Sequence, residues 1–118
     1  MLLRLFDPYI GGTGDLLTSD KHLNFRWNNP DCNIIFSVTK QGKAAVSHFI
    51  SDKSGLRKLE QAINDWCKFC FFLFEWCEMI IGVIERNSVS KLAERCGFRL
   101  VASFGNKKVY VRRKSWVV

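Results

Sequence analysis

The stretch IIGVIERNSVSKLAERCGFRLVAS, residues 80–103, decides the fold of this chain. It opens with an unbroken apolar run, which is typical of a central strand buried on both faces. Residues 90–96 then carry the apolar spacing of a short helix. Gly97 follows, and a glycine often supplies the left-handed residue that ends a helix. The stretch therefore predicts a central strand at 78–85, a short helix, and another strand that begins at Phe98.

More strands are predicted upstream of this stretch. Apolar or alternating runs predict strands at residues 1–6, 22–27, 33–39 and 44–51. We expect Asp7-Pro8 to end the first of them. GGTGD at 11–15 is expected to form a loop, and KQGK at 40–43 is expected to close a hairpin between the last two strands.

One long amphipathic helix is predicted at residues 54–71, with Asp52 or Ser54 as its N-cap. Apolar residues recur there at intervals of three and four, at Leu56, Leu59, Ile63, Trp66 and Cys70. Because strands flank this helix, a right-handed crossover should join them and bring them together in parallel. Residues 98–104 and 108–113 alternate around a Gly-Asn pair and predict a closing antiparallel hairpin.

The composition predicts one soluble α/β domain. The chain has 118 residues, of which 47% are hydrophobic and 25% charged, a length and balance typical of a single globular domain. The apolar run at 69–84 is too short for a membrane span and contains two glutamates, so we expect no membrane association. No secretory signal is recognised, and we expect a cytoplasmic protein.

The five cysteines are predicted to be reduced, and all of them except Cys32 are predicted to lie in the core. They are Cys32, Cys67, Cys70, Cys77 and Cys96, and an odd number argues against a framework of disulfides. CKFC at 67–70 has the spacing of a metal or redox pair, but neither a second pair nor a histidine lies near it in the sequence. Aromatic residues surround it on the predicted helix. We therefore predict metal-free core thiols, with metal or redox chemistry as the alternative.

The net charge of +7 comes entirely from residues 53–118. A basic half indicates an anionic partner such as a phosphate-bearing cofactor, a nucleic acid or an acidic protein face. The basic residues near the C-terminus are Lys107, Lys108, Arg112, Arg113 and Lys114. Together with Tyr110 and Trp116 they could bind nucleic acid through phosphate contacts and stacking. A solvated, charged hairpin is the alternative.

Residues 33–113 resemble the GNAT family of N-acetyltransferases. The quoted stretch is similar to the family's fifth strand, the Asn that follows it, the short fourth helix, and the Gly-Phe pair that begins the next strand. The resemblance implies an α/β fold with a central mixed β-sheet, one long helix and one short helix. It makes residues 1–118 a single GNAT-like domain with a reduced N-terminal region at 1–32. It also implies acetyl-coenzyme A (acetyl-CoA) as cofactor and an amine as acetyl acceptor.

The resemblance further implies where the cofactor binds. In the family, the cofactor enters where the fourth and fifth strands part, and its pyrophosphate sits at the N-terminus of the following helix, whose free N–H groups attract anions. The matching residues of this chain are Phe49, Ile50, Lys53, Ser54, Gly55, Leu56, Arg57 and Asn87. Asn87 corresponds to the Asn that contacts the pantetheine arm.

Three departures from the family pattern bear on activity. The phosphate loop usually reads Gln/Arg-x-x-Gly-x-Gly/Ala, whereas this chain has DKSGLR at 52–57. Asp52 there would repel a pyrophosphate, and Arg57 would hinder close approach to the backbone. Ala93 stands where the family often carries a Tyr that acts as acid for the leaving thiolate. The region between the first two strands is also short.

In these respects the chain is similar to small, degenerate GNAT-like proteins encoded by tailed bacteriophages. That likeness implies a host cytoplasm or a virion as its location. It also implies an alternative function, in which a catalytically reduced scaffold works in phage structure, assembly or host interaction through a protein partner or self-association. Under that alternative we expect weak binding of acetyl-CoA and little acetyl transfer.

Two residues are candidates for the base that takes a proton from the acceptor amine. His48 lies in the predicted strand at 44–51, and its alternative role is that of a hydrogen-bonded core histidine. Glu85 lies near the mouth of the expected cleft, and its alternative role is that of a surface carboxylate. Ser90 or Tyr110 could supply a proton to the leaving group, and the sequence favours neither.

Overall fold

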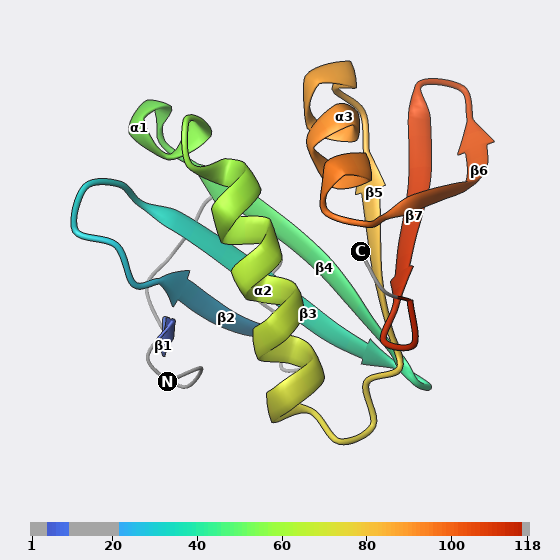
Figure 1. Cartoon of the computed structure of the whole chain (residues 1–118), viewed down its shortest axis with the longest axis horizontal. Coiled ribbons are helices and arrows are strands. Elements are labelled where there is room, and N and C mark those ends of the chain that lie inside the picture. Colours follow the sequence, from blue (N-terminus) through green and yellow to red (C-terminus); the bar gives the residue numbers. More distant parts are fainter. Residues whose placement is uncertain (1–4, 10–21, 117–118) are drawn as a thin grey trace.

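The computed structural model describes residues 5–9 and 22–116. The strands of this part of the chain form a seven-stranded sheet in the order β1-β2-β3-β4-β5-β7-β6. The elements are β1 Phe6–Pro8, β2 His22–Trp27, β3 Ile34–Gln41, β4 Ala44–Ser51, α1 Lys53–Leu56, α2 Leu59–Leu73, β5 Met79–Ile84, α3 Asn87–Arg95, β6 Arg99–Phe104 and β7 Lys107–Arg113. Helix α2 crosses β2, β3 and β4 on one face of the sheet, and α3 lies beside it near β5 and β7 (Figure 1). The loop predicted at 11–15 lies outside the described residues.

The pairing of the strands confirms the predicted mixed sheet. β3 pairs antiparallel with β4, and β6 pairs antiparallel with β7, as the two predicted hairpins require. β4 and β5 pair in parallel, which confirms the predicted consequence of the crossover through α2. Gly97 has a φ of 90°, so the short helix α3 is followed by the left-handed glycine that its sequence indicated.

The long helix begins later than the apolar spacing predicted. α1 is a single turn, and Arg57 and Lys58 separate it from α2, so the helix predicted at 54–71 is interrupted. The step from Leu56 to Leu59 continues the apolar pattern across the interruption, which is why the spacing did not reveal it. Leu56 is 48% exposed and lies outside the core, whereas Leu59 is buried.

The first strand also differs from the prediction. β1 runs through Asp7 and Pro8 instead of ending at them, and Pro8 stands opposite Phe25 of β2. Proline has no backbone N–H to donate, but β1 is the outermost strand of the described sheet, where one edge needs no partner. Of the strand predicted at 1–6, residues 1–4 lie outside the described residues.

β5 is central in the sheet, as predicted, because it lies between β4 and β7. The prediction that it is buried on both faces is wrong. Ile80 is 1% exposed, whereas Val83, on the opposite face, is 43% exposed. Because α2 and α3 lie on the same face of the sheet (Figure 1), residues that alternate along β5 differ in burial although all are apolar or glycine.

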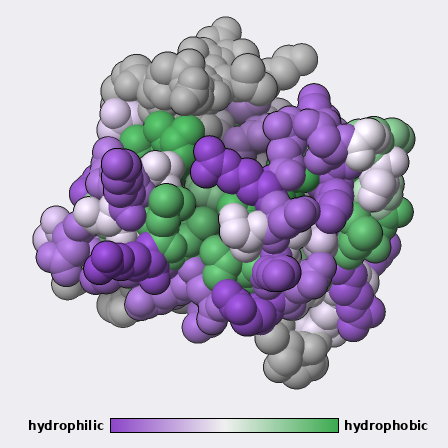
Figure 2. All heavy atoms as spheres, turned by 90° about the horizontal axis from the view of Figure 1, so that it is seen from above, coloured by the Kyte–Doolittle hydropathy of each residue, from purple (hydrophilic) through white to green (hydrophobic). Residues whose placement is uncertain are grey.

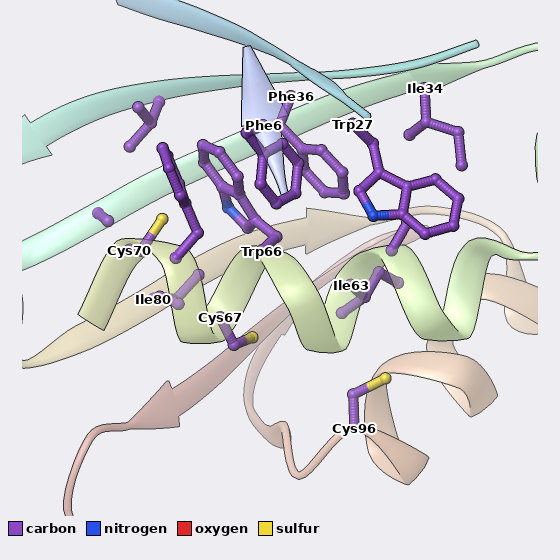
Figure 3. Close-up of a cluster of buried hydrophobic side chains, with 14 of the residues drawn as sticks. Phe6, Trp27, Ile34, Phe36, Ile63, Trp66, Cys67, Cys70, Ile80 and Cys96 are labelled. Carbon is purple, nitrogen blue, oxygen red and sulfur yellow. The ribbon is translucent and has the colours of Figure 1, made fainter. Parts of the chain in front are cut away.

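An aromatic cluster between α2 and the sheet forms much of the core (Figure 3). The indole of Trp66 stacks on Phe36 of β3 with ring centroids 4.8 Å apart, and Phe6 meets Trp66 edge-on at 5.2 Å. Such ring pairs add about 0.5–1.5 kcal/mol each beyond the burial of apolar area. The described residues contain no helix that is long and apolar enough to cross a membrane.

All five cysteines are buried free thiols, which confirms the predicted burial of Cys67 and Cys70. Burial raises the pKa of Cys67 to about 12 and the pKa of Cys96 to about 11. Thiols that rarely ionise are poor nucleophiles. No cluster of three or more metal-ligating side chains occurs within the described ranges. That the cysteines hold no metal stays a prediction.

Candidate functional site

Strands β4 and β5 pair over only part of their length. The parallel register joins residues 44–47 to residues 79–82 and ends there. Beyond this point β4 stays paired with β3 as far as Ser51, and β5 stays paired with β7 as far as Ile84. The sheet therefore forks between β4 and β5, and beyond the fork their facing edges pair with no other described strand. Figure 1 shows the two strands diverging toward α1 and α3.

A cavity of about 240 Å³ opens in this fork. Residues 47–50 of β4 and 80–84 of β5 line its sides, and Ile63 and Trp66 of α2 and Ala93 of α3 line it from the helices. Most of these side chains are apolar. Figure 2 looks onto this end of the molecule and shows hydrophobic patches among hydrophilic atoms. The fork is therefore an apolar recess with a polar rim.

One hydrogen bond fixes α2 at the fork. The indole Nε1 of Trp66 donates to Ser47 Oγ over 2.9 Å. Ser47 is the last residue of β4 that pairs with β5, and its partner there is Gly82. A Cβ built on Gly82 would meet no atom within 4 Å, so there is space beside the strands where they part. No sequence pattern singled out Ser47 or Gly82, because the contact that gives them their importance joins separate elements.

His48 lies just beyond the fork. It stands opposite Ser37 of β3, and its side chain lies on the other face of β4 from Ser47, which bonds to α2. His48 is half-buried and is one of the residues that line the cavity. Burial, and to a lesser degree the nearby His22, lower the pKa of His48 below its ordinary value of 6.5. The ring is therefore neutral at pH 7 and able to accept a proton.

Several solved structures share this architecture. A variant of the spermidine N-acetyltransferase SpeG from Vibrio cholerae matches 81% of this chain and 68% of its own, with a TM-score of 0.67 and 16% identity. The N-acetyltransferase PseH from Campylobacter jejuni, solved in complex with acetyl coenzyme A, matches 82% of this chain and 71% of its own, with a TM-score of 0.67 and 11% identity. An acetyltransferase of the GNAT family from Bacillus anthracis matches 79% and 66%, with a TM-score of 0.59 and 15% identity.

This chain has the GNAT fold. No protein-family model and no curated protein matches it. With identities of 11–16%, the likeness to the solved structures concerns the fold. What the fork of this particular GNAT fold can bind therefore depends on the side chains that surround it.

Residues 52–57, which comprise Asp52, α1 and Arg57 and are called the α1 loop below, contain a carboxylate that is already hydrogen-bonded within the chain. The Asp52 carboxylate accepts a hydrogen bond from the Gly55 N–H over 2.7 Å through Oδ1, and another from the Asn33 N–H over 3.0 Å through Oδ2. Asp52 is thus the N-cap of α1. Gly55 is buried, and a Cβ built on it would come within 2.6 Å of Ile34 Cγ1. Gly55 is therefore required for packing against β3, and its N–H is already engaged.

The other residues that were predicted to bind the cofactor fall into two groups in the structure: some line the cavity and some do not. Phe49 and Ile50 line the cavity. Four residues of the α1 loop are exposed and lie outside the cavity lining: Lys53, Ser54, Leu56 and Arg57. Asn87 is the exposed first residue of α3, and its Oδ1 accepts a hydrogen bond from Lys108 Nζ over 3.4 Å. Only the residues from β4 thus reach the recess itself.

The two candidate bases are placed differently. Glu85 follows Ile84, the last residue of β5, and is exposed outside the cavity lining. His48 forms part of that lining. A base must come within hydrogen-bond reach of the proton that it takes. The geometry therefore favours His48 over Glu85.

The candidate proton donors lie away from the recess. Tyr110 donates its hydroxyl hydrogen to Glu94 Oε2 over 2.8 Å and is 1% exposed, so it cannot stack on a nucleic-acid base as the sequence suggested. Ser90 is also buried, and neither residue belongs to the cavity lining. Ala93 lines the cavity, and its methyl group has no proton to give.

The basic residues near the C-terminus do not form one patch. Lys107 and Lys108 begin β7 and Arg113 ends it, and a seven-residue strand separates its ends by about 20 Å. Lys114 follows at the second end, and Arg112 has a buried Nε atom. Nucleic-acid binding by these residues stays a prediction, and it would have to use two separate groups of cations.

Proposed function

We propose that this protein holds the pantetheine arm of an acyl thioester such as acetyl-CoA in the fork between β4 and β5, and transfers the acetyl group to an amine. One observation carries the proposal: strand pairing ends at Ser47 and Gly82 and leaves a mostly apolar recess between two free strand edges. An extended ligand with amide groups can add to such an edge through backbone hydrogen bonds. The fold shared with solved N-acetyltransferases, one of them in complex with acetyl coenzyme A, supports the proposal.

The recess fits the arm, whereas the α1 loop does not fit the pyrophosphate of coenzyme A. The carboxylate of Asp52 already accepts the Gly55 N–H that a phosphate would need. Its negative charge would also repel a phosphate. We therefore assign the arm and the thioester to the recess and no phosphate-binding role to α1.

His48 is the base in this proposal. A bound thioester supplies an activated acetyl group. As the amine nitrogen forms its bond to the acetyl carbon and the carbon–sulfur bond breaks, the neutral imidazole takes the proton that the nitrogen loses. The leaving sulfur must take its proton from solvent, because Ala93 offers none. A missing general acid slows transfer by about a hundredfold to ten thousandfold, so we expect slow turnover.

The test is an assay of the thiol released from acetyl-CoA and from S-acetyl-pantetheine in the presence of polyamines, small amines and lysine-containing peptides. We expect slow release that depends on an amine. His48→Gln should reduce kcat/KM by about a hundredfold or more, and Glu85→Gln should leave it within about threefold. Circular dichroism of each variant checks that the fold is intact. A loss confined to Glu85→Gln would instead make Glu85 the base.

A second candidate function is that of a catalytically reduced GNAT scaffold that works through a protein partner or self-association. The anion at the α1 loop and Ala93 in the recess favour it, because each removes a part that acetyl transfer commonly uses. In this case no amine releases thiol above background, and the association survives both His48→Ala and Glu85→Gln. Size-exclusion chromatography of the two variants, beside the thiol assay, separates the two functions.

A further inference from the structure

At the open end of the fork, the α1 loop cannot bind another anion because the Asp52 carboxylate already occupies its backbone N–H groups. Both oxygens of Asp52 accept backbone hydrogen bonds, so the carboxylate ties α1 to the residue before β3. Gly55 is held against Ile34 and cannot turn its N–H elsewhere without losing that packing. A pyrophosphate would have to displace a carboxylate that two hydrogen bonds hold. The α1 loop therefore offers no binding site for the pyrophosphate of a nucleotide.

Four exposed cations nevertheless lie on the segments at this end of the fork, beside the exposed carboxylate of Glu85. Lys53 begins α1 and Arg57 follows it, Arg86 comes shortly after β5, and Lys107 begins β7, which runs antiparallel to β5. None of the four forms an ion pair with another described residue. Figure 2 shows hydrophobic patches on this face with hydrophilic atoms between them. Because these cations come from three separate segments around the recess, they match a broad acidic surface better than one phosphate group.

We propose that the acyl donor is a phosphopantetheine arm carried by an acidic protein, in place of free coenzyme A. This inference rests on the proposed function, since it requires the arm to enter the fork. A carrier-bound arm ends in one phosphodiester and has no nucleotide, so it needs nothing from the loop that Asp52 occupies. The acidic surface of the carrier lies against Lys53, Arg57, Arg86 and Lys107. The thiol formed on transfer remains on the arm.

Calorimetric titration with three donors tests this. They are S-acetyl-4′-phosphopantetheine, acetyl-CoA, and an acidic acyl carrier protein loaded with acetyl-phosphopantetheine. We expect the dissociation constants of acetyl-CoA and of S-acetyl-4′-phosphopantetheine, called the small arm below, to agree within about threefold, because the protein does not bind the nucleotide. The loaded carrier should bind at least about tenfold more tightly than the small arm at low salt, and high salt should remove that advantage.

The outcomes that contradict the inference differ from those that contradict the proposed function. Acetyl-CoA that binds more than about tenfold more tightly than the small arm would show that the nucleotide is recognised after all. A loaded carrier that binds no more tightly than the small arm would also overturn the inference. Both results leave the arm in the fork. Failure of all three donors to bind would overturn the proposed function itself.

Charge reversals at the rim test the carrier surface. The double change Lys53→Glu with Arg86→Glu should weaken binding of the loaded carrier by about tenfold or more and leave binding of the uncharged S-acetyl-pantetheine unchanged. Lys68→Glu is the matched control, because Lys68 is an exposed cation in the C-terminal half of α2, away from the fork. Equal loss of carrier affinity in the control would show a general effect of net charge and contradict a specific surface.

Substitutions at Asp52 test the closed loop. Asp52→Gly frees the N–H groups of Gly55 and Asn33, and a glycine N-cap costs only a few tenths of a kcal/mol. We expect this variant to bind acetyl-CoA more tightly and the phosphate-free S-acetyl-pantetheine as before. Asp52→Asn keeps an acceptor for Gly55 and should gain less. Unchanged affinity of Asp52→Gly for acetyl-CoA would show that the carboxylate is not what excludes the nucleotide.

Discussion

Trp66 of α2 donates its indole hydrogen to Ser47 Oγ over 2.9 Å, at the last position where β4 pairs with β5. The same indole stacks on Phe36 at a centroid distance of 4.8 Å and is 1% exposed. It also lines the cavity in the fork. The Trp66–Ser47 pair therefore connects the aromatic core to the strand that lines the recess.

Ser47→Ala should lower the free energy of unfolding by about 1–3 kcal/mol, because it leaves the buried indole N–H of Trp66 without an acceptor. Urea unfolding followed by circular dichroism measures the change. In a Trp66→Phe background, which has no indole N–H, the same Ser47→Ala change should cost little. Equal costs in the two backgrounds would show that the hydrogen bond does not contribute to stability.

Two glycine substitutions separate packing from the mere addition of a methyl group. Gly55→Ala should destabilise the protein by about 1–3 kcal/mol, because its Cβ would come within 2.6 Å of Ile34 Cγ1. Gly82→Ala is the matched control, since its Cβ would meet no atom within 4 Å. It should leave stability unchanged or raise it by up to about 1 kcal/mol. Equal losses in urea unfolding would contradict the packing assigned to Gly55.

Stability should fall in mildly acidic solution because of His48. Its pKa in the folded chain lies below 6.5, owing first to burial and then to His22. As the pH falls below about 6.5, the unfolded chain takes up a proton that the folded chain does not, so the free energy of unfolding decreases until the folded pKa is passed. His48→Gln should lose less stability than the parent between about pH 7.5 and pH 5.5. Equal losses would show that His48 is not the group responsible.

The buried thiols should react slowly in the folded protein. Burial raises the pKa of Cys67 to about 12, and those of Cys77 and Cys96 to about 11. At pH 8 only about one Cys67 side chain in ten thousand is then a thiolate. Mass spectrometry after iodoacetamide treatment should find these three residues unmodified in the native protein and alkylated in guanidinium chloride. Elemental analysis should find no zinc, and rapid native labelling of Cys67 would contradict its burial.

Most of the fold could be predicted because local patterns determine it. The apolar run before Asn87 and the glycine at position 97 were sufficient for β5 and α3, and the order of elements was sufficient for their parallel and antiparallel neighbours. The errors fall where the position in the sheet decides. Pro8 is tolerated in β1 because that strand is outermost, and Val83 is exposed because the helices cover the other face. Neither circumstance can be read from a short window of sequence.

The candidate site could be predicted only in outline. Alternation along β4 places neighbouring residues on opposite faces, and the resemblance indicated that Phe49 and Ile50 border the fork. The contacts that decide what the fork can bind join distant residues: 19 positions separate Asp52 from Asn33, and 19 separate Trp66 from Ser47. Periodicity reports which face a residue occupies and not which partner it meets. The hydrogen bonds by which the Asp52 carboxylate occupies the α1 loop could therefore be found only in the three-dimensional structure.

The central claim is that the fork between β4 and β5 holds an acyl-pantetheine arm. Backbone amide NMR of the protein during titration with S-acetyl-pantetheine tests it most directly. We predict that the largest saturating changes in chemical shift fall on residues 48–50 and 82–84, which line the recess. Gly82→Val fills space beside the fork, so it should remove these changes while the dispersion of the other amide signals still shows a folded protein. Shift changes that gather elsewhere on the sheet, or that persist unchanged in Gly82→Val, would contradict the claim.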